Sequence, residues 1–351
     1  MTSEPHTVTL RDPGDIITAV PAMLGFIPER SLVLVSFEPG GRRVAVTMRQ
    51  DLDLDPDGYP TEMMEATVAH LCEVCLQHDA SRVVAVVVDD RFELDHGCWD
   101  ILFAEIDSGL DDVGLEAGFV VDDIARGRQW RTGWGLSEPY VGGGLLDDPR
   151  TCAMAVAQAV TTGRVVLRSR GEMVESTRPT DHCGDRRCGL GRAGTPAGGD
   201  LDDAELLRRV LDAVLIGVDR DTTCPEVMVL ETAIRRVTVR DALLALAVSD
   251  VADAAEVLWA ELTRRLRGSG RACAAALLGH LNYVRGDGAM AGVAFDRALE
   301  SDPDHSLARL LDRSLRAGMR PSTLAELLPT SYAAAEKLGV VLPGPAERDA
   351  G

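Results

Sequence analysis

A run of ten residues at positions 51–60, DLDLDPDGYP, has the residue types of a calcium-binding loop. Read from Asp53, it matches the first six positions of such a loop, in which alternating carboxylates bind the ion and a glycine makes the sharp turn. The twelfth position must be a bidentate glutamate, but Met64 occupies it. We therefore predict the acidic end of a strand, then a turn and a helix capped by Thr61.

A second group of possible metal ligands lies in a glycine-rich segment and consists of His182, Cys183 and Cys188. A loop can fold imidazole and thiolate ligands around zinc, but a closed site needs four of them. No fourth ligand is evident, and two neighbouring arginines add unfavourable charge. We favour incidental cysteines in a linker and expect no cofactor, with a zinc site as the alternative.

Arginine side chains flank two expected strands in an otherwise acidic region, and clustered guanidinium groups can bind an anion. The alternative, which we favour, is that each arginine pairs with one of the many carboxylates of the chain. The candidate anion-binding residues are Arg128, Trp130, Arg164, Arg168 and Arg170, with Arg126 and Arg131 beside them.

The chain carries 56 acidic and 36 basic side chains, a formal net charge of −20. Such a surface repels phosphate backbones and anionic lipid, so we expect neither nucleic acid nor a membrane as a partner. Lys337 is the single lysine, which leaves no phosphate-loop lysine and no plausible Schiff-base lysine. Eight dispersed cysteines and a start without a basic and apolar leader predict a cytoplasmic protein.

The first half of the chain alternates β-type and helical segments, which predicts an α/β or α+β sandwich domain over residues 1–178. The expected strands are Ser31–Phe37, Arg43–Met48, Arg82–Val88, Phe119–Val121, Gln129–Thr132 and Arg164–Leu167, and the expected helices are Ile16–Met23, Thr61–Gln77, Cys98–Leu110 and Thr151–Thr161.

Residues 179–200 hold six glycines and two prolines with few apolar residues, which is typical of a linker. From Leu201 onward the segments have helical periodicity, so we expect an all-α, repeat-like domain over residues 201–340. The remaining residues, 341–351, are expected to form a disordered tail.

Within the helical half, Leu278–Pro303 resembles one tetratricopeptide repeat. Small residues such as Gly279 let two helices approach closely, Phe295 fills the gap between them, and Gly286 lies in the turn. We expect flanking helical pairs to stack on this hairpin as a small array. The alternative is an irregular helical bundle that contains one repeat-like hairpin.

The opening segment is similar to the start of an actinobacterial family catalogued as domain of unknown function number four-one-nine-two. The resemblance rests on Val-Pro-x-x-Leu-Gly-Phe-x-Pro-x-x-Ser at Val20–Ser31, and weaker matches extend it from about residue 8 to 322. Members commonly carry a cysteine-rich segment after the position of Trp130, which this chain lacks. The resemblance therefore implies an architecture and an actinobacterial host, but no activity and no metal or redox role.

These observations favour a protein-interaction or regulatory module whose helical domain binds a protein partner or a second copy. The candidate interaction residues are Asn282, Arg285 and Arg309. An enzyme or small-anion-binding protein that uses the arginine set is the alternative, and we identify no catalytic residue. An open groove beside Ala275–Ala298 would favour interaction, whereas filling of that groove by neighbouring helices would count against it.

Overall fold

A computed structural model gives the structure of the chain and describes residues 12–40, 43–135, 142–180, 198–217 and 223–346. The chain divides into two compact units, Met1–Glu172 and Met173–Gly351. Within the described ranges, no helix is both long and apolar enough to cross a lipid bilayer.

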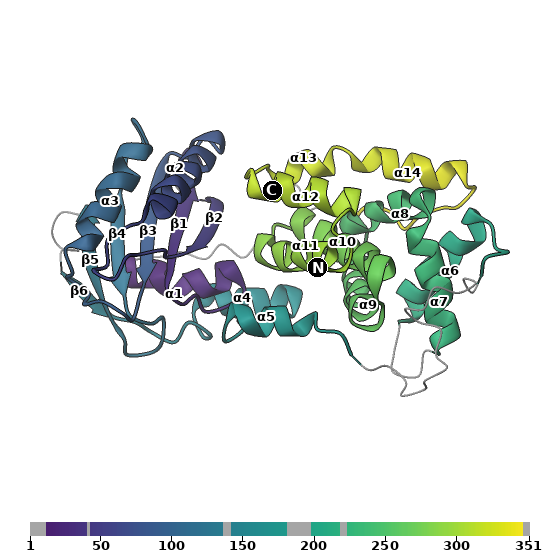
Figure 1. The fold of residues 1–351 in the computed structure, drawn as a ribbon, viewed down its shortest axis with the longest axis horizontal. Coiled ribbons are helices and arrows are strands. Elements are labelled where there is room, and N and C mark those ends of the chain that lie inside the picture. The colour runs from purple at the N-terminus through teal and green to yellow at the C-terminus, as the bar shows by residue number, and fades with distance from the viewer. Residues whose placement is uncertain (1–11, 41–42, 136–141, 181–197, 218–222, 347–351) are drawn as a thin grey trace, which may run out of the picture. The chain divides into compact units, whose positions relative to one another are not determined.

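The first unit is built on a six-stranded mixed sheet with the strand order β2-β1-β3-β4-β5-β6 (Figure 1). β3 and β4 run parallel, whereas the other neighbouring pairs are antiparallel. This confirms the predicted mixture of strands and helices. The strands are β1 (Ser31–Phe37), β2 (Val44–Asp51), β3 (Arg82–Val88), β4 (Ala117–Val121), β5 (Gln129–Gly135) and β6 (Gly143–Leu145).

Two helices, α2 (Glu62–Gln77) and α3 (Cys98–Gly109), cover one face of this sheet (Figure 1). Alternate strand residues such as Leu34 point toward them, as the two-residue period of a strand requires, and join one buried cluster. Thr61 caps α2 by accepting a hydrogen bond from the amide of Met64, as predicted.

The opposite face of the sheet packs against α1 (Pro13–Leu24). The strand residues that point to this side, among them Val33 and Phe119, are fully buried. Trp130 of β5 packs edge-on against Phe119 with ring centroids 5.4 Å apart. The Trp130 indole also lies so close to Gly14 that a Cβ there would come within 3.3 Å of Nε1. β5 and α1 are therefore held in close contact.

The predicted strand at Arg164–Leu167 is not formed, and this prediction was wrong. The segment lies between α4 (Ala153–Thr162) and α5 (Arg170–Ser176) and makes a single bridge, between Leu167 and Phe26. Val165 is exposed to solvent, so the run has no buried face that would fix it in the sheet.

The second unit is mostly helical, as expected from the periodicity of the sequence. Its core is mostly aliphatic and also contains the buried Trp259. Its elements beyond α5 are α6 (Asp203–Ile216), α7 (Cys224–Arg235), α8 (Val237–Leu243), the 3₁₀ helix η1 (Leu244–Val248), α9 (Ala252–Arg265), α10 (Gly268–Val284), α11 (Gly288–Ser301), α12 (Ser306–Arg316), α13 (Pro321–Ala325) and α14 (Leu328–Lys337).

The helix α10 forms the centre of this unit, and every residue from Gly270 to Tyr283 is buried. It packs on α11 through Gly279 and Phe295, and Gly286 turns the chain between the two helices with a φ of 83°. Ala275 and Ala298 lie in a closed cluster of small side chains. In the described part of the chain, no open groove lies beside them, because the chain's own helices fill this space, and this counts against an interaction role for this part of the helical unit.

Buried arginines attach the start of the second unit to its helices. The guanidinium of Arg271 donates to the carbonyls of Thr263 and Thr177, each at 3.0 Å. Arg297 donates to the hydroxyl of Thr177 at 3.1 Å and to the carbonyl of Val174 at 3.3 Å. These bonds satisfy the backbone acceptors of a segment that has few apolar contacts of its own.

The described end of the chain packs against the helical unit instead of forming the expected tail. Val340 and Leu342 are buried in the main cluster. Pro345 forms a bridge with Ser249, and the amide of Ala346 donates to the carbonyl of Val248 at 2.8 Å. This segment, residues 339–346, is called the C-terminal strap below.

Candidate functional site

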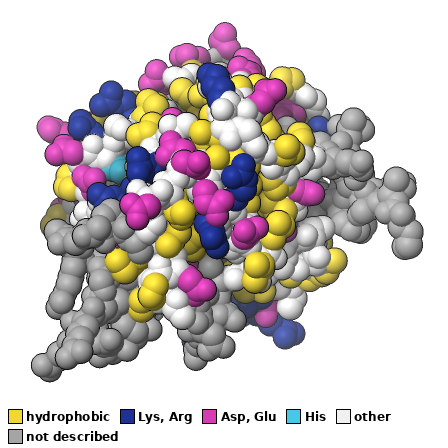
Figure 2. All heavy atoms as spheres, turned by 90° about the vertical axis from the view of Figure 1, so that its right-hand side faces the viewer, with side chains coloured by type: hydrophobic (Ala, Val, Ile, Leu, Met, Phe, Trp, Pro, Cys, Tyr) yellow, Lys and Arg dark blue, Asp and Glu magenta, His cyan; other side chains and the backbone are white. Residues whose placement is uncertain are grey.

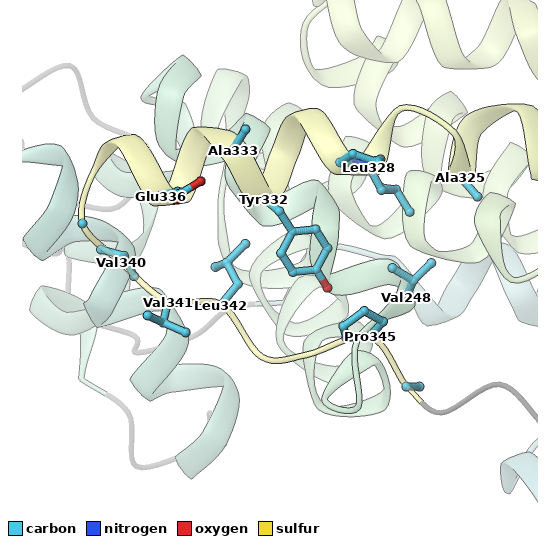
Figure 3. A pocket seen from close by; sticks show the side chains of 13 residues that line it. Val248, Ala325, Leu328, Tyr332, Ala333, Glu336, Val340, Val341, Leu342 and Pro345 are labelled. Atoms are coloured by element: carbon cyan, nitrogen blue, oxygen red, sulfur yellow. The ribbon is translucent and has the colours of Figure 1, made fainter.

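An apolar groove lies between α14 and the C-terminal strap (Figure 3). Its volume is about 1040 Å³, which is at the upper end of the range of small-ligand pockets. Side chains from α14 form one wall, the strap forms the other, and Val248 of η1 lies at one end. The α14 and strap residues that line it are Leu328, Pro329, Tyr332, Ala333, Glu336, Gly339, Val340, Val341, Leu342, Pro345 and Ala346.

The groove owes its shape to the sharp turn between α14 and the strap. Gly339 has a φ of 66°, in the left-handed region that glycine adopts without strain, and so ends the helix. The amide of Val340 then donates to the carbonyl of Ala335 at 3.1 Å. The strap is thereby directed back along the helix that it has just left.

Polar contacts fix the far part of the strap. The hydroxyl of Tyr332 donates to the carbonyl of Pro343 at 3.2 Å, and the amide of Asp250 donates to the carbonyl of Gly344 at 3.2 Å. Burial, with a smaller contribution from Asp250, raises the pKa of Tyr332. The phenol therefore stays a neutral donor at physiological pH.

The middle of the strap contains backbone groups that no described residue pairs with. Within the described chain, the amide and carbonyl groups of Val341 and Leu342 make no hydrogen bond. Val341 is 92% exposed, an unusual position for a β-branched apolar residue. Leu327, beside the other wall, is also exposed. Unpaired backbone groups and exposed apolar side chains thus occur together along one groove.

Glu336 is the charged side chain among those that line the groove. It is exposed at the end of α14. On the face of the molecule drawn in Figure 2, acidic and basic side chains alternate with apolar ones and no large field of one sign appears. The groove is thus an apolar surface with a local negative charge.

The structure places carboxylates beside several of the arginines predicted as an anion site. Arg128 pairs with Asp122 at 2.9 Å and with Asp123 at 3.6 Å, while Arg131 pairs with Asp95 at 3.0 Å. Trp130 is buried between the sheet and α1. The remaining three lie after α4, where the amide of Arg168 donates to Glu172, and Arg164 and Arg170 have partners of their own.

The residues predicted to bind a partner differ widely in exposure. Asn282 is fully buried, and its amide donates to the carbonyl of Leu278, so it cannot reach a partner. Arg285 pairs with Glu256 at 2.8 Å and also with Asp253. Arg309 is exposed and lies 3.8 Å from Asp304. None of these three residues lines the groove along α14.

The candidate metal ligands divide into two cases. His182, Cys183 and Cys188 lie outside the described residues. In the acidic run, Asp55 accepts hydrogen bonds from the amides of Asp57 and Tyr59, and Asp53 accepts one from the Thr61 hydroxyl. These carboxylates close a turn and support the helix cap, as predicted. Across the described residues, no cluster of three or more His, Cys, Asp or Glu side chains is arranged to bind a metal.

The comparisons with known proteins identify a family. The family model described as "Domain of unknown function (DUF4192)" matches residues 13–322. No curated protein matches the chain, and no solved structure matches it.

Proposed function

We propose that this chain, which belongs to the family of the domain of unknown function DUF4192, binds an extended segment of a partner protein in the groove along α14. The bound segment would add a strand to the C-terminal strap and place alternate apolar side chains against α14. The chain would then act as a protein-interaction module, with the helical unit as the binding part.

The observation that carries this proposal is that the backbone groups of Val341 and Leu342, beside the apolar groove, make no hydrogen bond to any other described residue. Strand addition is a common mode of peptide recognition, in which backbone hydrogen bonds supply affinity and pockets for alternate side chains supply specificity. The strap already pairs with another segment through a bridge between Pro345 and Ser249. An incoming strand therefore meets a backbone that needs little reorganisation.

Charge indicates the kind of segment that fits. Glu336 lies on the groove, and the whole chain has a net charge of −20. A segment with lysine or arginine next to its apolar residues is attracted by this field, whereas an acidic one is repelled. We therefore expect apolar residues at alternate positions, flanked by basic residues.

A selection from a display library of 12-residue peptides tests the proposal. We expect the full-length chain to enrich apolar and basic sequences, and we expect Val341→Asp to weaken the selected peptides at least about tenfold, or 1.4 kcal/mol. Val341 is exposed, so this substitution leaves the core intact. Val257→Asp is the matched control, because Val257 is an exposed valine of α9 outside the groove.

Three outcomes would contradict the proposal. One is enrichment of peptides that bind Val341→Asp as well as the unaltered chain. Another is selection of amphipathic helices, which would show that strand addition is not the mode of binding. The third is self-association that Val341→Asp abolishes, measured by sedimentation velocity, since a second copy would then occupy the groove.

A further inference from the structure

The imidazole of His305 connects two helices of the second unit. His305 is the N-cap of α12, and its Nδ1 accepts a hydrogen bond from the backbone amide of Ala308 at 3.2 Å. Its other ring nitrogen, Nε2, lies 3.3 Å from the Sγ of Cys273 in α10. His305 and Cys273 are both buried, with 7% and 6% of their surface exposed. One ring thus caps the start of α12 and contacts α10 at the same time.

The contact with Ala308 sets which nitrogen of the ring carries the hydrogen. A nitrogen that accepts a hydrogen bond needs a free lone pair, so in the neutral ring the hydrogen is on Nε2, which donates it to the sulfur of Cys273. Burial raises the pKa of Cys273 to about 11, so the sulfur is a neutral thiol and provides no negative charge beside the ring. The charged groups around this thiol are Arg235, Arg240, Glu231 and Asp302.

Two charged groups of the described chain act on the ring itself. Arg240 of α8, which pairs with Asp241 at 2.7 Å, disfavours a second positive charge, whereas Asp302, the C-cap of α11, favours it. Burial and Arg240 together outweigh Asp302, so the pKa of His305 lies below its ordinary value of 6.5. The ring is therefore neutral at physiological pH, and the lone pair of Nδ1 is able to cap the helix.

Protonation of the ring removes the cap. An imidazolium carries a hydrogen on both nitrogens, so Nδ1 becomes a donor that faces the amide of Ala308, which is also a donor. Ala308 is fully buried, so water does not replace the lost hydrogen bond. The added positive charge also lies at the N-terminal end of α12, where the helix dipole disfavours it. Nε2 keeps its hydrogen and its contact with Cys273, and the effect of protonation therefore falls on α12.

We infer that His305 is a pH-dependent cap: its neutral ring holds the first turn of α12, and protonation of the ring releases that turn. The released ring binds a proton more readily than the buried ring does. The cap is therefore fully effective above pH 6.5 and is lost as the pH falls toward the lowered pKa of the buried ring. Ala308 lies in a closed cluster with Ala275 and Ala298, so release of the turn exposes small apolar side chains of α10 and α11 in acid.

Nuclear magnetic resonance of the ¹⁵N-labelled full-length chain tests this inference at the ring and at the cap. At pH 7.5 we expect His305 to be the tautomer with its hydrogen on Nε2. Between pH 7.5 and pH 5, the exchange protection of the Ala308 amide, corrected for the intrinsic pH dependence of exchange, should fall about tenfold, because the released ring has an ordinary pKa and the buried ring a lower one. The other tautomer at pH 7.5, or unchanged protection, would overturn the inference.

His305→Asn replaces the titrating cap by one that does not titrate. Asparagine is a favoured N-cap whose side-chain oxygen accepts the same amide hydrogen bond. We expect the protection of the Ala308 amide in this variant to be nearly the same at pH 7.5 and pH 5. His70→Asn makes the same change at an exposed position of α2 and should keep the tenfold loss. If His305→Asn loses as much protection as the unaltered chain, another group causes the loss and the inference is wrong.

A low concentration of urea separates release of one turn from unfolding of the whole unit. Opening of a single turn exposes little surface, so exchange of the Ala308 amide at pH 5 should hardly change when about 1 M urea is added. Global unfolding exposes much more surface and increases steeply with urea. A steep increase in exchange of Ala308 would show that acid unfolds the helical unit as a whole and would contradict the proposed release of α12.

Discussion

The ring of Phe295 fills the space that a side chain at position 279 would need: a Cβ built on Gly279 would lie 2.3 Å from Cε1 of Phe295. Phe295 is fully buried and packs edge-on against Tyr283, with ring centroids 6.5 Å apart. The α10–α11 contact at the centre of the second unit thus depends on the absence of a single methyl group.

We expect Gly279→Ala to destabilise the chain by about 2 kcal/mol, because overpacking a core costs about 1–3 kcal/mol. Gly292→Ala is the control: its Cβ would meet Leu315 at an ordinary 3.7 Å, and alanine favours a helix. Urea denaturation measures both variants. Equal stability of Gly279→Ala and the unaltered chain would show that α10 and α11 are not packed this closely.

Arg271 provides a second prediction. Its guanidinium donates to two buried carbonyls, and burial together with Arg297 and Arg267 lowers its pKa. Replacement by leucine leaves both carbonyls without a donor, so we expect Arg271→Leu to lower the free energy of unfolding by about 2–4 kcal/mol. Arg313→Leu, at an exposed position of α12, should change it by less than about 0.5 kcal/mol. A similar loss in both variants would contradict this role of Arg271.

Acid should destabilise the second unit through His280. Burial lowers the pKa of His280 from 6.5 to about 4. The unfolded chain therefore binds a proton more readily than the folded one. The resulting stability is fully present above pH 6.5 and is lost as the pH falls toward 4. The loss is on the order of 3 kcal/mol.

Denaturation at pH 5 and at pH 7.5 measures the part of this loss that occurs between those two pH values, about 2 kcal/mol. His280→Leu should reduce the difference in stability between the two pH values, whereas the exposed-site control His70→Leu should retain it. The same pH dependence in His280→Leu and the unaltered chain would assign the acid sensitivity to other groups. His305 is one such group, because burial and Arg240 lower its pKa as well.

Docking of the C-terminal strap is testable by truncation. Val340 and Leu342 are 7% and 8% exposed, and burial of such a side chain contributes about 1.5–3 kcal/mol. A chain that ends after Gly339 should therefore unfold at clearly lower urea concentration than one that ends after Ala346. Equal midpoints for these two chains would show that the strap contributes nothing to the fold.

Local patterns predicted the elements of the first unit well. The strand at Ser31–Phe37 was predicted with its exact bounds, and the cap at Thr61 follows from the side chain's own chemistry. The strap was missed because Pro343 and Pro345 are typical of a tail. Its docking depends on a surface that α14 and η1 form only in the folded chain.

Asn282 shows how a surface prediction fails for a central helix. A polar residue in a helix is normally exposed, but α10 is surrounded by other helices, so its polar side chain bonds to its own backbone. The sequence did hold a signal: between Arg271 and Arg285 no acidic residue, lysine or arginine interrupts the helix. A helix without a charged face is usually buried.

Hydrogen exchange of the C-terminal strap tests the central claim most directly. The amides of Val341 and Leu342 have no partner in the described chain and should exchange rapidly in the free protein. When a selected apolar and basic peptide is added, strand addition predicts slowed exchange in residues 340–346, and Val341→Asp should prevent it. Peptide binding that leaves exchange of this segment unchanged would contradict the proposed function.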